Sequence, residues 1–259
     1  MIVGSIKENL SLEKRVSITP ETAKNIINLG LQVLLENNYA THIGIAEKEY
    51  EAMGVEIKNS SKEVLNNCNL LTKVNCPSDE EISNLKNNTI LIGVLNPSKN
   101  QSKINDIVKK GISVFSLELL PRISRAQSMD VLSSQSNLAG YRSVVDSIYE
   151  FEKAIPMMMT AAGTVPAAKV LVIGAGVAGL QAIATAKRLG AIVSATDVRA
   201  ASKEQVESLG GKFLTVDQSE NLETKGGYAK EVSEDFKKKQ AEMMKDALKK
   251  NDIVICTAL

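Results

Sequence analysis

Three glycines, Gly174, Gly176 and Gly179, form the pattern G-x-G-x-x-G, whose spacing suits phosphate binding. An apolar run (170–173) precedes them directly, and an apolar segment of helical character (177–189) follows. In a strand–turn–helix context the first glycine makes the tight turn, the second lets the backbone approach a pyrophosphate, and the third lets the helix pack on the strand. Free N–H groups at the helix start then face the anion. The pattern predicts a dinucleotide site; the alternative is that the glycines serve only the turn.

Asp197 lies at the end of the next predicted strand, where a carboxylate can bind the ribose hydroxyls of the adenosine half. A carboxylate in this place would repel a 2′-phosphate, so Asp197 favours NAD over NADP. Arg199 lies two residues further on and could accept such a phosphate. The alternative for Arg199 is an ion pair at the protein surface.

The string RISRAQSMD carries a second group of polar side chains. Arg122 and Arg125 offer planar donor groups that suit phosphate or carboxamide oxygens. Gln127 can both donate and accept hydrogen bonds, as a carboxamide or ribose partner requires. For Arg125 and Asp130 the alternative is an ion pair that shapes the loop. For Ser133, Ser134 and Ser136 it is helix capping.

The sequence alternates strand-like and helix-like segments that would position these residues. The predicted strands are 2–6, 31–36, 55–57, 70–74, 89–94, 112–116, 169–173, 191–196, 212–215 and 253–256. A helix is predicted to open at Pro20 with Thr19 as its N-cap, and another to end at Gly54. Further helices are predicted over 104–111, 137–159, 177–189, 202–209 and 231–250.

Strands that alternate with helices imply parallel sheets covered on both faces. The predicted fold class is therefore α/β, with two Rossmann-like parallel-sheet domains: an N-terminal α/β domain over 1–136 and an NAD-binding Rossmann domain over 137–259. Segment 253–256 is predicted to be a buried strand, and few residues follow it. Because domains rarely end on a central strand, we expect the second domain to be truncated at its C-terminus.

The composition excludes several classes of protein. The net charge of the 259 residues is +1 and aromatic residues make up 3%, which argues against a nucleic-acid binder. The three cysteines lack metal-ligand spacing and are expected to be free, buried thiols. The apolar stretch 154–186 contains several glycines and prolines and a central Lys169, so we expect no membrane span. The run Met157 to Met159 is expected to serve as adaptable packing.

Taken together, several segments resemble the NAD(H)-binding first domain of the alpha subunit of proton-translocating NAD(P) transhydrogenase. The segments are KRVSITP (14–20), TKVN (72–75), PRISRAQSMD (121–130), SQSNLAGY (134–141), MMMTAAGTVP (157–166) and GGYAK (226–230). The resemblance covers essentially all 259 residues, and the string RISRAQSMD is far more specific than the glycine pattern.

The resemblance implies where the cofactor binds. In that family the loop that carries RISRAQSMD lies over the nicotinamide, so the residues implied there are Arg122, Ile123, Ser124, Arg125, Gln127, Ser128, Met129, Asp130 and Ser133. Of these, Arg122, Gln127 and Asp130 would be catalytic. The residues implied to hold the rest of the dinucleotide are Gly174, Gly176, Val177, Gly179, Asp197, Val198 and Arg199, with Gly227 and Tyr228 in a mobile closing loop and Gln240 and Leu259 as further lining positions.

The resemblance also implies partners. The chain would pass hydride from NADH to NADP⁺ bound on a partner domain, together with the membrane and NADP-binding subunits of a transhydrogenase. It would form a homodimer and lie in the cytoplasm, peripheral to the inner membrane through those subunits. Family members continue beyond the equivalent of Leu259, so a nucleotide-binding module without activity of its own is an alternative.

A second alternative is an NAD-dependent enzyme like alanine dehydrogenase, which shares the fold. Oxidising an amino acid to an imine and hydrolysing it requires proton transfers, and hence a general acid–base. The one histidine is His42, and the stretch after strand 89–94, where that family's catalytic histidine should follow, has none. Arg15 and Lys73 could bind a carboxylate substrate, although structural pairing within the first domain is the better interpretation. Hydride exchange between two nicotinamides needs only orientation and exclusion of water.

Overall fold

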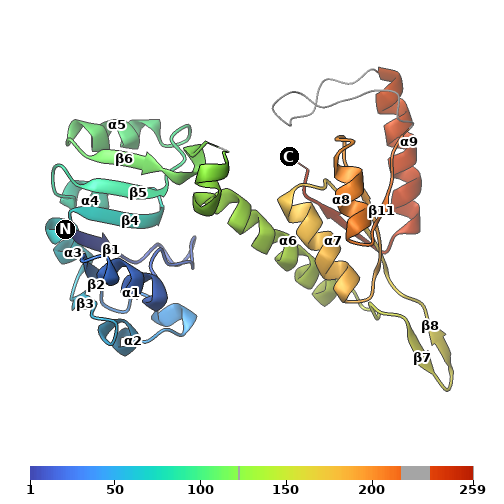
Figure 1. The fold of residues 1–259 in the computed structure, drawn as a ribbon, viewed down its shortest axis with the longest axis horizontal. Coiled ribbons are helices and arrows are strands. Elements are labelled where there is room, and N and C mark those ends of the chain that lie inside the picture. Colours follow the sequence, from blue (N-terminus) through green and yellow to red (C-terminus); the bar gives the residue numbers. More distant parts are fainter. Residues whose placement is uncertain (122, 217–233, 259) are drawn as a thin grey trace. The chain divides into compact units, whose positions relative to one another are not determined.

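The computed structural model describes residues 1–121, 123–216 and 234–258 (Figure 1). The chain forms two compact units, residues 1–131 and 132–259. Each unit is built on a parallel sheet with helices packed against it, which confirms the predicted α/β class with two parallel-sheet domains. The predicted division between residues 136 and 137 lies inside a long helix, α6 (Val131–Glu150).

The first unit contains a six-stranded sheet in the order β3-β2-β1-β4-β5-β6. Its strands are β1 (Ile2–Ser5), β2 (Gln32–Glu36), β3 (Glu56–Lys58), β4 (Leu70–Asn75), β5 (Ile90–Val94) and β6 (Ser113–Ser116). All five strand pairings are parallel. From β1 the next strands in the chain, β2 and β3, are added toward one edge of the sheet, and from β4 the strands β5 and β6 are added toward the other edge. The strand order therefore reverses between the two central strands, β1 and β4.

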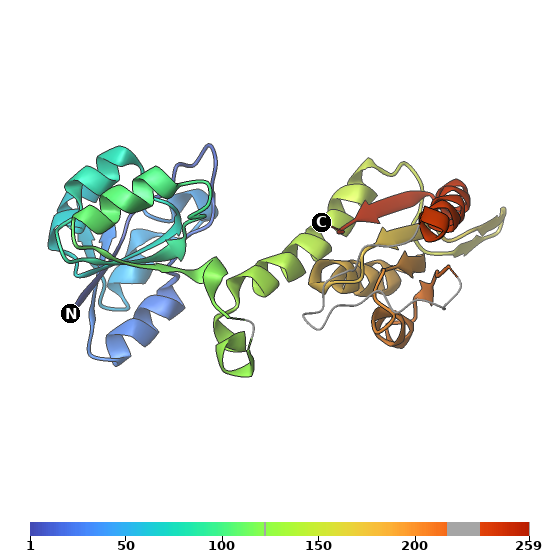
Figure 2. The same cartoon turned by 90° about the horizontal axis from the view of Figure 1, so that it is seen from above.

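Helices cover both faces of this sheet (Figure 2). They are α1 (Pro20–Asn28), α2 (Glu47–Glu51), α3 (Ser61–Asn67), α4 (Asp79–Asn84) and α5 (Gln101–Lys109), with short 3₁₀ turns η1 (Thr41–Ile43), η2 (Leu117–Leu119) and η3 (Ser124–Met129). Strand β2 contributes Val33 and Leu35 to one apolar core and Leu34 to the other. This alternation follows from the two-residue period of a strand whose two faces are both covered.

Helix starts in the first unit follow local capping chemistry. Thr19 caps α1 as predicted, since the amide of Thr22 donates to its Oγ1 at 3.2 Å and Pro20 takes the first helical position. Ser60 and Ser78 cap α3 and α4 in the same way, and Glu81 completes a capping box with Ser78. Both helices are short, 7 and 6 residues, and the sequence patterns used above did not identify them.

The second unit contains a four-stranded sheet in the order β11-β10-β9-β12. Its strands are β9 (Lys169–Ile173), β10 (Ile192–Thr196), β11 (Lys212–Phe213) and β12 (Ile253–Cys256), and its further helices are α7 (Val177–Arg188), α8 (Ser202–Ser208) and α9 (Glu234–Lys250). Strand β12 is an edge strand of this sheet, and only one of its faces is buried, through Ile253 and Ile255. The prediction of a buried strand is therefore confirmed for one face alone, and Cys256, on the other face, is exposed rather than buried.

The long helix was predicted over 137–159, and its observed bounds differ at both ends. It begins at Val131, because residues 131–136 contain neither proline nor glycine, and it ends at Glu150, before Pro156. An antiparallel hairpin follows, formed by β7 (Met158–Thr160) and β8 (Gly163–Val165). The three methionines expected to serve as packing are exposed there, with Met159 at 80%, so that prediction was wrong.

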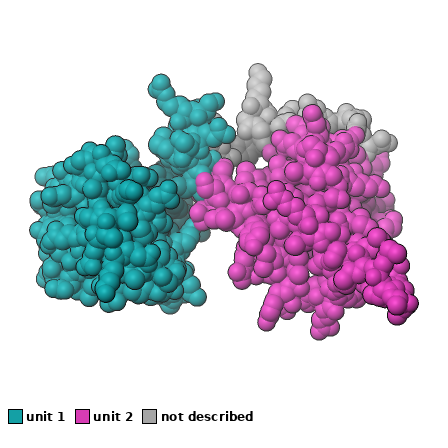
Figure 3. Space-filling view, turned by 60° about the horizontal axis from the view of Figure 1, so that its bottom comes forward, with its two compact units in different colours: residues 1–131 teal, residues 132–259 magenta. Residues whose placement is uncertain are grey.

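The two units are coloured separately in Figure 3. In the second unit, α6 contributes Val144 and Ile148 to the core around β9 and β12. Across the described residues, no helix has both the length and the apolar character needed to cross a bilayer.

Candidate functional site

The glycine turn between β9 and α7 has the geometry expected of a phosphate-binding turn. Gly174 adopts a left-handed φ of +95°, and its amide donates to the Thr196 carbonyl at 2.8 Å. A Cβ on Gly179 would lie 1.8 Å from the Gly174 carbonyl oxygen, so only glycine allows this helix to pack against the turn. A Cβ on Gly176, in contrast, would meet no heavy atom within 4 Å. The first and third glycines are needed by the fold, and the second leaves open space.

Helix α7 begins at this open space. Gly176 is its N-cap residue and provides no side chain to cap it. The first N–H groups of any helix lack partners within the helix and carry its positive dipole end. An anion beside Gly176 would therefore meet backbone donors and no obstructing side chain. These features fit the pyrophosphate of a dinucleotide.

Thr257 supports the same turn from the end of the neighbouring strand β12. Its Oγ1 donates to the Gly174 carbonyl at 2.9 Å, and its amide donates to the Ile173 carbonyl at 2.8 Å. A Cβ on Gly174 would lie 2.9 Å from this hydroxyl, so turn and threonine fit together. The sequence analysis missed Thr257, because the contact depends on β12 pairing with β9 across 83 residues of chain.

Asp197 follows β10 and is directed toward the glycine turn. Its side chain is 7% exposed, and its Oδ2 accepts a hydrogen bond from the amide of Ala175 at 2.7 Å. Arg199 donates to Oδ1 from its backbone amide at 2.8 Å and from Nε at 3.0 Å, and to Oδ2 from Nη2 at 3.0 Å. Burial alone would raise the pKa of Asp197, but the hydrogen bonds from Arg199 and Ala175 lower it overall. Asp197 is thus held ionised, and Arg199 is ion-paired as the alternative interpretation expected.

The loop implied to cover the nicotinamide forms the 3₁₀ turn η3 in the first unit. Ala126 is its buried anchor, while Arg125, Gln127 and Ser128 are exposed and Asp130 is half-buried. Asp130 has an interaction partner, and the ion pairs between described residues do not join it to Arg125, so the roles of these two residues stay predictions. Because α6 already begins at Val131, the serines expected to cap a helix, Ser133, Ser134 and Ser136, lie within its first two turns.

The remaining predicted site residues are divided between the two units and the undescribed segments. In the second unit lie Gly174, Gly176, Val177, Gly179, Asp197, Val198 and Arg199, and hydrogen bonds join Asp197 both to the glycine turn and to Arg199. Gln240 is half-buried on α9. Ile123, Ser124 and Met129 are exposed on the loop of the first unit. Arg122, Gly227, Tyr228 and Leu259 lie outside the described residues.

Lys73, one of the two cations considered as a carboxylate anchor, is paired within the first unit. Its side chain is 3% exposed, and Nζ lies 2.9 Å from Glu81 Oε1 and 3.5 Å from Glu8 Oε2. Glu8 also accepts a hydrogen bond from the amide of Val74 at 2.7 Å. Burial raises the pKa of Glu8, and the charge of Lys73 and the Val74 amide oppose that rise.

Arg15, the second cation, is bound by Glu13. Nε and Nη2 donate to the two oxygens of that carboxylate at 2.8 and 2.7 Å. The hydrogen bonds from Arg15 are the main reason that the pKa of Glu13 falls to about 2. Structural pairing, the preferred interpretation for Arg15 and Lys73, is therefore confirmed.

His42 lies on the exposed 3₁₀ turn η1, where its Nε2 donates to the Lys14 carbonyl at 2.8 Å. After β5, the amides of Leu95 and Asn96 donate to Glu118.

Among the described residues, no group of three or more His, Cys, Asp or Glu side chains could hold a metal ion. The described cysteines are free, as predicted, although only Cys68 is fully buried.

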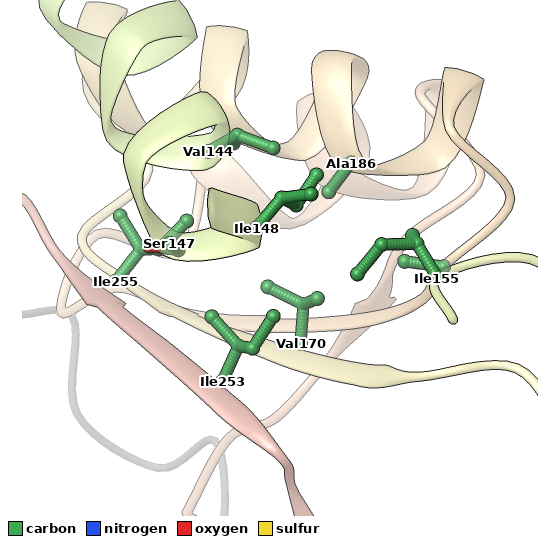
Figure 4. Close-up of a pocket in the computed structure, with 9 residues that line it drawn as sticks. Val144, Ser147, Ile148, Ile155, Val170, Ala186, Ile253 and Ile255 are labelled. Atoms are coloured by element: carbon green, nitrogen blue, oxygen red, sulfur yellow. The ribbon is translucent and has the colours of Figure 1, made fainter. Parts of the chain in front are cut away.

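One pocket of the second unit lies between α6 and the sheet (Figure 4). Val144 and Ile148 of α6 face Val170, Ile253 and Ile255 across it, and its free volume is about 10 Å³. That is about the space of one water molecule, and the lining is almost wholly apolar. This pocket is a packing defect of the core and has no room for a nucleotide.

Comparison with protein families shows two matches that together span nearly all of the chain. Residues 4–139 match the alanine dehydrogenase/PNT N-terminal domain, and residues 143–259 match the alanine dehydrogenase/PNT C-terminal domain. The chain belongs to the alanine dehydrogenase/PNT family. The glycine turn, Asp197 and Arg199 all lie in the C-terminal family domain.

Individual members of this family are similar over the whole chain. The first part of NAD(P) transhydrogenase subunit alpha of Rhodospirillum rubrum is 52% identical over 100% of this chain and 69% of that protein. The crystal structure of transhydrogenase from Sinorhizobium meliloti has a TM-score of 0.87 at 44% identity, covering 100% of this chain and 70% of that one. Alanine dehydrogenase of Mycolicibacterium smegmatis is 26% identical over 100% of this chain and 65% of that protein. The comparisons confirm the predicted resemblance to the NAD(H)-binding alpha component of NAD(P) transhydrogenase.

Proposed function

We propose that this chain holds NADH at the glycine turn and presents its nicotinamide to NADP⁺ bound on a partner polypeptide. The observation that carries the proposal is the open space at Gly176 beside the uncapped start of α7. A pyrophosphate fits there because it needs close approach of the backbone and unpaired amides. The adenosine ribose would then lie at Asp197, whose carboxylate lies beside the glycine turn and can accept hydrogen bonds from ribose hydroxyls in exchange for those it receives from Arg199.

The reaction assigns simple tasks to the chain's own residues. NADH supplies the hydride, which moves between two nicotinamide rings without making or breaking an O–H or N–H bond. The protein therefore has to orient the ring and exclude water. We assign these tasks to Arg122, Gln127 and Asp130. The residues that complete the lining of the nicotinamide end are Ile123, Ser124, Arg125, Ser128, Met129 and Ser133. Gly227, Tyr228, Gln240 and Leu259 are assigned to the adenosine side.

The partners in this proposal are the membrane and NADP-binding subunits of a transhydrogenase. The chain itself would act as a homodimer in the cytoplasm, attached to the inner membrane through those subunits. The support is the similarity to proteins named as the first part of subunit alpha, a name that implies further parts of the enzyme.

Amino-acid dehydrogenation is a weaker candidate, and the pairing of Lys73 and Arg15 counts against it. A carboxylate substrate would have to displace Glu8 or Glu81 from Lys73, or Glu13 from Arg15. Displacing a buried ion-pair partner leaves that carboxylate uncompensated, which is unfavourable. The exposed His42 is also bound to the backbone of residue 14, remote in sequence from the glycine turn.

Titration of the chain with NADH, with Gly176→Ala as the probe, tests the binding site. The added methyl group meets open space in the protein, so the unfolding free energy should change by less than about 0.5 kcal/mol. The same methyl group occupies the place of the pyrophosphate, so the NADH dissociation constant should rise about tenfold or more, which is about 1.4 kcal/mol. An unchanged dissociation constant would remove the glycine turn from the site.

Reconstitution tests the reaction. The chain is mixed with the membrane and NADP-binding subunits of a transhydrogenase, and NADH-dependent reduction of NADP⁺ is followed. We expect reduction that requires the chain. NADH binding without reduction would favour a nucleotide-binding module, and reduction of NAD⁺ by alanine would favour the amino-acid dehydrogenase.

A further inference from the structure

Helices α6 and α7 of the second unit touch through their backbones at Gly140. A Cβ built on Gly140 would lie 2.0 Å from the Ala178 carbonyl oxygen and 3.0 Å from the Ala178 Cα. Gly140 is buried, and no side chain of any size fits between the two helices at this point. The contact therefore requires glycine for space, independently of any backbone strain.

The position of the contact on α7 is significant. Ala178 is the second residue of α7 and lies between Gly176, where the open space is found, and Gly179, which packs on the turn. Helix α7 is held by the sheet, since Gly179 abuts Gly174 and Ala182, Ile183 and Ala186 are buried. A side chain at position 140 would consequently shift α6, because α7 cannot retreat.

The position of the contact on α6 is equally informative. Ser133 lies seven residues before Gly140, which is two helical turns, so both residues lie on the same face of the helix. Val144, four residues after Gly140, packs into the core from that face as well. The residues assigned to the nicotinamide end thus come directly before the Gly140 contact in the chain, and those assigned to the pyrophosphate come directly after the strand against which α6 packs.

We propose that Gly140 is a positioning residue, which sets the distance between Ser133 on α6 and the pyrophosphate site at the start of α7. This inference rests on the proposed function, because it takes Ser133 to contact the nicotinamide half. A ligand that spans both halves of the site depends on that distance. A ligand confined to the adenosine and pyrophosphate half does not.

The test compares NADH with ADP as ligands of Gly140→Ala. ADP contains the adenosine and the diphosphate but no nicotinamide ribose. We expect the dissociation constant of ADP to stay within about twofold of the unmodified chain, and that of NADH to rise about tenfold. The matched control is Ala139→Ser, which adds one atom at the exposed neighbouring position and should leave both constants unchanged.

Several outcomes would overturn the inference. Alanine favours a helix over glycine, so a stabilised Gly140→Ala with unchanged NADH binding would show that the contact positions nothing. Equal weakening of both ligands would assign Gly140 to the fold of the unit. If Gly140→Ala shows no cooperative unfolding transition and so does not fold, Ser133→Ala tests the premise instead: weaker NADH binding with unchanged ADP binding supports the inference, and unchanged NADH binding refutes it. Failure of the unmodified chain to bind NADH would instead refute the proposed function.

Discussion

The two parallel sheets of this chain each have a point where the strand order reverses, and the two points are built in opposite ways. In the first sheet the reversal lies between β1 and β4, and in the second between β9 and β12. Ligands of open α/β sheets bind at such points, beyond the carboxyl ends of the strands. In the first sheet this region holds Lys73, which pairs with both Glu8 and Glu81. In the second it holds the glycine turn, with backbone donors and open space at Gly176.

The difference shows that topology provides a position for a ligand, while side chains decide whether the position is used. At the first reversal the amide of Ser17 also donates to the Tyr39 hydroxyl, and this hydrogen bond fixes the loop that follows β1. At the second reversal the hydroxyl of Thr257 donates to the Gly174 carbonyl, and the space beside Gly176 stays open. One reversal serves stability and the other, in our proposal, serves binding.

The largest expected effect that distinguishes the two reversal points is on the free energy of unfolding. Lys73→Met leaves Glu8 and Glu81 close together without their shared cation, and breaking a buried pair from one side destabilises by about 3–5 kcal/mol. NADH binding by the folded fraction should stay within about twofold, because Lys73 belongs to the other unit. Urea denaturation and NADH titration measure the two quantities.

A matched control for Lys73→Met is Lys109→Met. Lys109 pairs with Asp106 at 2.9 Å, but both side chains are more than half exposed, so its loss should change stability by less than about 1 kcal/mol. Comparable losses from the two variants would mean that the buried pairing of Lys73 with Glu8 and Glu81 adds no special stability to the first unit.

An intermediate effect is expected at the second reversal. Thr257→Val keeps the shape of the side chain but removes the hydrogen bond to the Gly174 carbonyl, which should destabilise by about 1–2 kcal/mol. The turn also loses its support, so NADH should bind about tenfold more weakly. Thr164→Val, on the exposed hairpin strand β8, should change neither quantity. A loss of stability with unchanged NADH affinity would separate the turn's support from its binding role.

The smallest effect concerns acid sensitivity of the first unit. The pKa of Glu13 is about 2 in the folded chain against an ordinary value of 4.5, so its stabilising contribution is complete above pH 4.5 and is lost as the pH falls toward 2. Partial exposure of the Arg15–Glu13 pair limits this contribution to about 1 kcal/mol. Glu13→Gln should therefore flatten the fall of unfolding free energy between about pH 5 and pH 3. An unchanged slope would show that other carboxylates determine acid stability.

Features encoded in consecutive residues could be predicted from the sequence. The predicted bounds of β9 and β12 match those observed, because each is a short apolar run, and the glycine turn followed from spacing alone. Thr19 was identified as a cap because capping is local. Helix α6 was misplaced because its hydrophobic pattern continues into a hairpin whose methionines are exposed.

Features that depend on strand register could not be predicted in the same way. Thr257 reaches Gly174 only because β12 pairs with β9, and Lys73 reaches Glu8 only because β4 lies beside β1. Each contact joins residues more than 60 positions apart in the chain. The sequence pattern indicates which residues can bind a ligand, while the sheet order decides which of them are already occupied.

Asp197 has a consequence for how tightly any sugar can be held. A carboxylate has about four acceptor positions, and the two oxygens of Asp197 already receive four hydrogen bonds from Ala175 and Arg199. A ribose hydroxyl that approaches this carboxylate must exchange with one of those donors. The two backbone amides are fixed by the chain, so the guanidinium is the group that yields. The net gain at Asp197 is then the small difference between the hydrogen bond formed by the ribose and the one given up by Arg199. A small gain suits a site that must release its nucleotide in every turnover.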